Sequence, residues 1–273
     1  MSSDAALRGK TVIVTGASSG IGRAVAERLG AAGAHVYLAG RTLASMEEAK
    51  AKIEKSGGKA TVVSIDVRDV KQVQDLVQRA VRETGRLDVM VNNAGLSYPS
   101  PIVDADPDEW RAMLETNVLG LLAGCQAAVR AMRQCKAEGH IVNVSSIAAQ
   151  RADSGVYGAT KHAVSCISAT LRKELEEDTI RVVDVRPGAI ATNFARNFDP
   201  AFVANIIRAT GADIEVKKGE RMPDDVIDKL HAVMKQILAG ADDVANAVLY
   251  AVTQPITVNV SEIVVRPPKQ LAL

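Results

Sequence analysis

The 273-residue chain predicts an α/β fold: one doubly wound domain with a seven-stranded, mostly parallel sheet and helices on both faces. Short apolar runs rich in β-branched residues alternate with segments of helical period. The connections between them are short and include no linker, which is typical of parallel sheets with right-handed crossovers. Glycine or polar residues follow the strands, at the edge where such sheets form their ligand crevice.

The first expected strand, Thr11 to Val14, leads through Thr15 into a glycine-rich turn over residues 15–22 and then a helix. An apolar run without polar alternation suits a strand buried on both faces. Backbone N–H groups at such a helix start can bind a phosphate, and glycine permits its close approach. The alternative is an ordinary glycine-rich turn, because the spacing Gly-x-x-x-Gly-x-Gly differs from the commoner Gly-x-Gly-x-x-Gly.

The next three strands are expected at 35–39, 60–65 and 87–91, with helices at about 44–55 and 69–83 between them. Polar residues again follow the strand ends: Arg41, Asp66 and Asn93. The carboxyl ends of parallel strands meet at one edge of a sheet, so these residues are expected to share one crevice.

A helix is predicted to begin at Asp106, Pro107 and Glu109, which match the N-cap, N1 and N3 preferences. From Asn117 to Met132 a helix is apolar nearly all round, so it should be buried on more than one side. Asn117 is polar within it. It is either a capped or solvated amide, or a buried amide that holds a water or a backbone carbonyl near the site.

The fifth strand, 141–144, is followed by Ser145 and Ser146, and a helix then runs from Tyr157 to about Leu175. Tyr157 and Lys161 lie one helical turn apart on one face. A free tyrosine has a pKa near ~10, and a nearby ammonium favours the phenolate. The pair can therefore act as a general acid or base near pH 7, although the same spacing also occurs by chance on solvated helices.

The segment 193–240 departs from the strand–helix rhythm that precedes it. It follows a sixth strand at 181–185 and precedes a closing helix at 244–252 and a seventh strand at 261–265. All three phenylalanines of the chain, Phe194, Phe198 and Phe202, lie in it. They predict either a small satellite core or an apolar lid over the substrate, that is, a substrate lobe within the single domain.

Composition excludes several functional classes. A net charge of +1 gives no reason for nucleic-acid or membrane-surface binding, and no apolar stretch predicts a membrane span. Three cysteines and four histidines show no metal-ligand spacing, so we expect no metal. The cysteines suggest reduced thiols, and with no apolar signal core at the N-terminus they favour a cytoplasmic protein.

Six motifs in order along nearly the whole chain resemble the short-chain dehydrogenase/reductase family. They are Thr15-Gly-Ala-Ser-Ser-Gly-Ile-Gly22, Asn92-Asn-Ala-Gly95, Asn117, the serine pair before Tyr157, Tyr157-Gly-Ala-Thr-Lys161 and Pro187-Gly-Ala-Ile-Ala-Thr192. The resemblance implies a Rossmann-like fold, a nicotinamide dinucleotide and reversible hydride transfer between a small-molecule alcohol and a ketone. It also implies a homotetramer, or a homodimer, built from the long helices that begin near Trp110 and Tyr157.

The resemblance also implies the site residues. Tyr157 would be the general acid or base, with Lys161 lowering its pKa and holding the nicotinamide ribose. Ser146 would donate a hydrogen bond to the substrate oxygen, and Asn117 would anchor a water that relays protons to Lys161. The cofactor contacts implied at the strand ends and on the catalytic helix are Gly16, Ser18, Ser19, Gly20, Ile21, Gly22, Arg41, Thr42, Asp66, Val67, Asn93, Ala94, Gly95, Tyr157, Lys161, Pro187, Gly188, Ile190 and Thr192.

One departure from the family concerns the serine. Ser146 lies eleven residues before Tyr157, somewhat closer than usual, so the connecting loop is expected to be short. The motif alignment favours Ser146 over Ser145 as the catalytic serine. The shortened loop bears on contacts to the substrate more than on the serine itself.

The end of the second strand predicts NADP(H), with NAD(H) as the weaker alternative. NAD-preferring enzymes place an Asp or Glu there to bind the ribose 2′-OH. By family alignment this place is Gly40, and Arg41 follows it, although an arginine on a loop can also be merely solvated. A guanidinium suits a phosphate because it donates parallel hydrogen bonds and keeps its charge. Ser19 is neutral where some NADP-binding relatives carry a second basic residue, so Arg41 should act with only Thr42 or Ser18 beside it.

These observations predict an NADP-dependent carbonyl reductase or alcohol dehydrogenase. A 3-oxoacyl thioester reductase of the same family is the alternative, although the C-terminal segment VSEIVVRPPKQ looks more like the branch acting on 3-hydroxy acids, serine and miscellaneous carbonyls. A non-catalytic dinucleotide-binding regulator is disfavoured by the intact set of Ser146, Tyr157 and Lys161.

Overall fold

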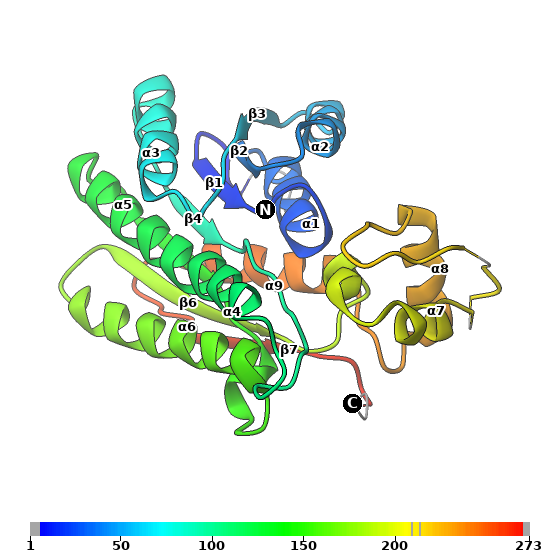
Figure 1. Ribbon diagram of the computed structural model, residues 1–273. Coiled ribbons are helices and arrows are strands. Elements are labelled where there is room, and N and C mark those ends of the chain that lie inside the picture. The colour runs from blue at the N-terminus through cyan, green and yellow to red at the C-terminus, as the bar shows by residue number, and fades with distance from the viewer. Residues whose placement is uncertain (1–5, 209, 213, 270–273) are drawn as a thin grey trace.

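A computed structural model describes residues 6–208, 210–212 and 214–269 of the chain (Figure 1). Its centre is a seven-stranded sheet of order β3-β2-β1-β4-β5-β6-β7, in which every neighbouring pair is parallel. The predicted fold class is therefore confirmed. The strands are β1 (Thr11–Thr15), β2 (His35–Gly40), β3 (Lys59–Ser64), β4 (Val89–Asn92), β5 (Gly139–Val144), β6 (Ile180–Pro187) and β7 (Glu262–Val265).

Helices cover both faces of this sheet (Figure 1). One face packs against three of them: α1 (Gly20–Ala31), α2 (Leu43–Lys55) and α9 (Ala241–Val252). The other face packs against α3 (Val70–Thr84), α5 (Gly120–Gln134) and α6 (Gly155–Glu174), with α4 (Pro107–Leu114) leading into α5.

Residues of one strand belong alternately to two hydrophobic cores. In β1, Val12 and Val14 join the core under α1 and α9, whereas Ile13 joins the core under α3 and α5. Successive strand residues point to opposite faces, so a strand covered on both sides needs an unbroken apolar run. That requirement explains why the run Thr11 to Val14 carries no polar alternation.

The predicted strands lie within two residues of the observed ones at each end. The closing helix begins earlier than predicted, at Ala241, because the Asp243 carboxylate accepts a hydrogen bond of 2.9 Å from Gly240 N and fixes the first turn. Acidic residues in a first turn are favourable to a helix start, a signal that the apolar period alone does not carry.

The two helices predicted after Asp106 form one continuous helical stretch. Between α4 and α5 lies a π-helical turn, Glu115–Leu119, which adds one residue to the helical repeat. Pro107–Gln134 is also long and apolar enough to cross a membrane by length and composition. It packs against the sheet instead, with nine buried residues in α5, so its apolar character is that of a core helix.

The segment after β6 forms a separate group of short helices beside the carboxyl edge of the sheet (Figure 1). It contains the 3₁₀ turn η4 (Asn193–Asn197), α7 (Pro200–Arg208) and α8 (Asp224–Met234). We call the described residues of 193–240 the lobe. Its apolar side chains form small clusters of their own, one around Val203 and Ile207 and one around Leu230 and Leu238.

Candidate active site

A cleft of about 1680 Å³ runs along the carboxyl ends of the strands and under the lobe. Its walls come from the turn after β1, the ends of β2 to β6, the start of α6, and the lobe. Of the residues that the sequence predicts for the site, all but two, Gly22 and Asn117, line this cleft. Both are buried behind its wall and shape it from there.

The turn after β1 is built so that only glycine fits at its key positions. Gly16 and Gly20 have positive φ angles of 66° and 54°, a region that L side chains rarely adopt. A Cβ on Gly22 would lie 2.4 Å from both Asn93 Nδ2 and Gly16 O. Gly16 and Gly22 therefore let the turn lie directly against the end of β4.

Thr15 and Asn93 tie this turn to the end of β4. Thr15 Oγ1 accepts hydrogen bonds from Asn93 N at 3.0 Å and Ala94 N at 3.1 Å, and Asn93 Nδ2 donates to Thr15 O at 2.9 Å. The α1 N-terminus that follows has no acidic residue in its first turn, and Ser18 and Ser19 line the cleft beside it. A helix N-terminus without a carboxylate suits a phosphate group.

The ends of β2 and β3 form the next part of the cleft. Arg41 is exposed there beside Thr42, and Val67 lines the same wall. Asp66 also lines it, but its carboxylate contacts the Arg68 guanidinium at 2.6 Å, and hydrogen bonding by Arg68 lowers the pKa of Asp66. An Asp66 carboxylate contact to a cofactor would have to coexist with this ion pair.

Asn117 is buried in the π-helical turn and holds the strand β4 loop. Its Oδ1 accepts from Leu96 N at 2.9 Å, and its Nδ2 donates to Leu96 O at 2.9 Å and to Thr160 Oγ1 at 3.0 Å. Of the two interpretations from the sequence, the buried amide that holds a backbone group is correct. It links the loop after β4 to the helix that carries Tyr157, whereas the water relay stays a prediction.

The two serines after β5 have different partners. Ser145 Oγ donates to Lys161 O at 3.0 Å and lies 3.1 Å from Ser165 Oγ, so it is used within the fold. Ser146 lines the cleft, where its hydroxyl lowers the pKa of Tyr157, and its Oγ accepts from Ala148 N at 3.1 Å. The geometry therefore favours Ser146, as the motif alignment does, and the short loop still brings it to Tyr157.

Tyr157 and Lys161 project from α6 into the cleft, with Lys161 Nζ 5.8 Å from the centre of the Tyr157 ring. Lys161 is buried and donates to Val144 O at 2.8 Å, and burial lowers its pKa to about 8. Burial raises the pKa of Tyr157 to about 12, against the opposing effect of Ser146.

Lys161 is not among the groups that shift the Tyr157 pKa in the protein by itself, so the lowering of that pKa by Lys161 stays a prediction. Desolvation disfavours the phenolate, and the ammonium hydrogen-bonds the Val144 carbonyl rather than the phenol oxygen. Tyr157 therefore holds its proton at neutral pH and is poised as a proton donor, with Ser146 as a hydrogen-bond donor beside it.

The segment after β6 closes the cleft opposite the glycine turn. A Cβ on Gly20 would lie 3.1 Å from the Thr192 side chain, and Gly188 N donates to Val265 O at 2.7 Å. Pro187 and Ile190 line the cleft beside them. The implied contacts around residues 187–192 thus face the turn at 15–22, although the two lie far apart in sequence.

The three phenylalanines play different parts. The Phe194 ring lies 5.4 Å from the Tyr157 ring, and Phe198 packs against the lobe cluster around Val203. The centre of the Phe202 ring lies 6.4 Å from the centre of the Phe198 ring, and Phe202 is 38% exposed at the cleft. Phe198 belongs to a satellite core, as one interpretation from the sequence has it, and all three rings line the cleft, whereas a lid over the substrate stays a prediction.

Two lobe arginines at the cleft were not predicted from the sequence. Arg196 and Arg221 line the end of the cleft near Arg41, and Arg221 Nη2 donates to Ser18 O at 2.7 Å. Nothing in their local sequence indicates this position, because only the folding of the lobe brings residue 221 to the turn after β1.

Comparisons with known proteins agree with this geometry. The sequence model of the short chain dehydrogenase family matches residues 10–201. An uncharacterised oxidoreductase of Staphylococcus aureus strain USA300 is 35% identical over 263 residues, covering 96% of this chain and 98% of that protein. The glycine betaine reductase ATRR of Emericella nidulans is also 35% identical over 263 residues, but these are 19% of its own length.

Solved structures are similar over almost the whole chain. A metagenomic short-chain oxidoreductase in complex with NADP has a TM-score of 0.75 and 28% identity, covering 96% of this chain and 99% of that one. A short-chain type dehydrogenase/reductase from Mycobacterium marinum has a TM-score of 0.78 and 27% identity, covering 95% of each chain.

The glycine turn provides a direct test of the cleft. Gly22→Ala places a methyl group against Asn93 and Gly16 O, so the turn must move away from β4. We expect dinucleotide binding, measured by calorimetry, to weaken by at least about tenfold, the scale of one lost hydrogen bond to a charged group.

Gly57→Ala is the control, because Gly57 has a φ of 85° but lies outside the cleft. It should lower stability by about 1–2 kcal/mol and leave binding unchanged; normal binding by Gly22→Ala would contradict the assignment.

Proposed function

The chain belongs to the short-chain dehydrogenase/reductase family and is an oxidoreductase, and from this we propose that it transfers a hydride between NADP(H) and a ketone or secondary alcohol. The observation that carries the proposal is the meeting of Ser146, Tyr157 and Lys161 in one cleft with the glycine turn. Ketone reduction needs a proton donor at the carbonyl oxygen, and Tyr157 supports that role because it holds its proton at neutral pH.

The residues of the cleft fit a dinucleotide. The turn at 15–22 offers backbone N–H groups and a helix N-terminus, and a side chain on Gly16 would collide with Ala94 Cα, 2.9 Å from its Cβ position. Gly95 lies close to two polar side chains of the site, since its Cβ position is 3.6 Å from Lys161 Nζ and 3.4 Å from Asn117 Oδ1. When bound, the dinucleotide supplies or accepts the hydride.

The chain's own residues handle the proton and the charge. Tyr157 gives its proton to the substrate oxygen as negative charge develops there, and Ser146 donates a hydrogen bond to the same oxygen. Lys161 places a buried positive charge near Tyr157, and its hydrogen bond to Val144 O holds that charge at a fixed point. Oxidation of an alcohol runs the same steps in reverse and requires the Tyr157 phenolate, which burial disfavours.

The cofactor preference rests on the end of β2. The last residue of β2 is Gly40, so this position carries no carboxylate that would repel a 2′-phosphate. The next residue, Arg41, is exposed at the cleft. The NADP bound to the metagenomic relative supports the same choice. We therefore propose NADP(H) as the preferred cofactor, with NAD(H) used less well.

We also propose an oligomer, a homotetramer or a homodimer, and a cytoplasmic location. Leu114, Leu119 and Leu122 are 50%, 42% and 42% exposed along the stretch from α4 to α5, a surface that supports a helix-to-helix contact with a second copy. The three cysteines are free in the structure, which supports a reducing compartment.

Removal of the Tyr157 hydroxyl tests the proposed chemistry. Tyr157→Phe should lower kcat for ketone reduction by at least ~10²-fold, the usual scale of general acid–base catalysis, while the Kd for NADPH stays nearly constant. Tyr250→Phe is a matched control, because Tyr250 is exposed on α9 outside the cleft. Retention of most of the activity in Tyr157→Phe would refute the assigned role.

The pH dependence follows from the two shifted groups. Tyr157 has a pKa of about 12 and therefore stays protonated at neutral and mildly alkaline pH. Lys161, in contrast, loses its charge as pH rises through about 8. We expect kcat/KM for reduction to be level below pH 8 and to fall above it. Lys161→Arg should shift this fall upward, since a guanidinium keeps its charge. A level profile up to pH 10 in the wild type would count against a charged Lys161 as a requirement.

Arg41 tests the cofactor preference. A charge-assisted hydrogen bond contributes about 1.5–3 kcal/mol, so the wild type should prefer NADPH over NADH in kcat/KM by roughly tenfold to a few hundredfold. Arg41→Ala should reduce this ratio, whereas Arg28→Ala, an exposed arginine of α1 away from the cleft, should leave it unchanged. A wild type that favours NADH would overturn the assignment.

A further inference from the structure

Three arginines from distant parts of the chain gather at one end of the cleft. Arg41 follows β2, Arg196 lies in η4, and Arg221 lies just before α8. Arg196 lies close enough to the other two to be affected by their charges: burial first, and then Arg41 and Arg221, lower the pKa of Arg196. A cluster of like charges is unfavourable by itself, so it indicates a missing negative partner.

No carboxylate contacts this cluster directly within the residues that the structure describes, although Asp224 and Glu48 act on Arg221 from a greater distance. None of the three guanidinium groups has a described Asp or Glu oxygen within 4.0 Å, whereas nearby Arg23 contacts Glu27, Glu48 and Asp224 at 2.9, 3.4 and 3.2 Å. The closest acidic groups are already engaged. Asp66 pairs with Arg68, and Asp224 pairs with Arg23.

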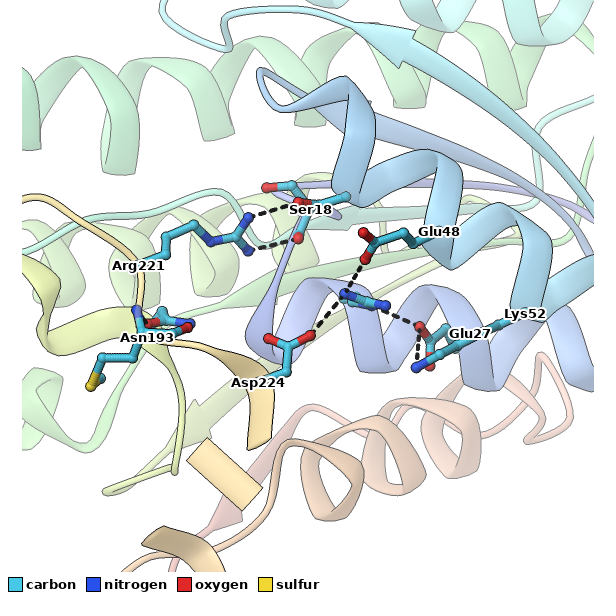
Figure 2. Close-up of polar contacts among 10 residues, drawn as sticks. Ser18, Glu27, Glu48, Lys52, Asn193, Arg221 and Asp224 are labelled. Atoms are coloured by element: carbon cyan, nitrogen blue, oxygen red, sulfur yellow. Dashed lines mark hydrogen bonds and ion pairs between the residues drawn. The ribbon is translucent and has the colours of Figure 1, made fainter. Parts of the chain in front are cut away.

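Arg221 lies where the glycine turn meets the start of α2 (Figure 2). Its Nη2 donates to Ser18 O at 2.7 Å, and its Nη1 donates to Ser45 Oγ at 3.0 Å. Ser45 is in the first turn of α2, the helix that follows Arg41 and Thr42. The Arg221 guanidinium and Arg41 therefore flank the same short stretch of chain, on the side of the cleft away from Tyr157.

The backbone that follows Arg221 is held in place by two sets of contacts (Figure 2). Next to it, Met222 N donates to the buried Asn193 Oδ1 at 2.7 Å, and Asn193 Nδ2 donates back to Met222 O at 3.1 Å. Asp224, three residues after Arg221, pairs with Arg23 of α1 at 3.2 Å. Arg221 thus reaches the glycine turn from a fixed point of the lobe rather than from a free loop.

We propose that Arg221 is a second specificity-determining residue for the cofactor, binding the adenosine 2′-phosphate opposite Arg41. This rests on the proposed use of NADP(H). Arg221 supplies the second basic group that some NADP-binding relatives carry at the position of Ser19 in the glycine turn. Because Arg221 belongs to the lobe and Arg41 to the sheet edge, a 2′-phosphate that binds both fixes the lobe over the cofactor. Arg196, deeper in the lobe, adds positive charge to the same place.

Direct binding measurements test the proposal without turnover. In Arg221→Ala the Kd for NADPH should rise by about tenfold to a hundredfold, the range of a lost charge-assisted hydrogen bond, while the Kd for NADH changes little. Arg221→Gln keeps a donor for Ser18 but loses the charge, so it should show the same selective loss even where Ala disturbs the lobe. Arg208→Ala is the control, an exposed lobe arginine that donates to Asn205 and lies outside the cleft.

Hydrogen exchange gives a second readout that involves no nicotinamide. Saturating 2′,5′-ADP should slow amide exchange across residues 214–230 in the wild type, and 5′-AMP should not. In Arg221→Gln the two nucleotides should act alike.

The outcomes separate this inference from the function on which it rests. If the wild type binds NADPH no more tightly than NADH, both the cofactor assignment and the role of Arg221 are overturned. If the wild type prefers NADPH and the Arg221 variants weaken NADPH and NADH equally, Arg221 is only a structural latch and this inference alone fails.

Discussion

The site depends on one buried hydrogen bond, from Lys161 Nζ to Val144 O at 2.8 Å. It joins the last residue of β5 to α6, the helix that carries Tyr157, and holds an ammonium group where water has little access. A buried charge is costly unless it is bound, so the end of β5 and the start of α6 must stay in register. Ser145 reinforces this by donating to Lys161 O at 3.0 Å.

The position of the Lys161 ammonium also bears on the protonation state of Tyr157. The bound ammonium lies beside the ring rather than on the phenol oxygen, and burial leaves the tyrosine protonated. The same cleft therefore favours proton donation over proton removal, which fits carbonyl reduction better than alcohol oxidation. At the opposite end the glycine turn, Arg41 and Arg221 line a part of the cleft whose positive charge suits a phosphate group.

Much of this could be predicted from the sequence, because it depends on local signals. Apolar runs gave the strands, and glycine spacing gave the turn at 15–22. The motif order gave Ser146, Tyr157 and Lys161. The effect of Lys161 on the Tyr157 pKa stays a prediction, because spacing on a helix shows that Lys161 is near but not that it hydrogen-bonds Val144 O. Arg221 could not be predicted, because its place depends on how the lobe folds back across more than 200 residues.

In the reaction that we propose, a carbonyl carbon bound in the cleft accepts a hydride from the cofactor. The most direct measurement uses NADPH carrying deuterium at the transferable C4 position, with a panel of ketones, keto acids and acyl thioesters, and mass spectrometry of the products. The account predicts one deuterium on the carbinol carbon of an alcohol product, formed in step with loss of NADPH absorbance. Consumption of NADPH with no deuterium in any alcohol product would contradict it.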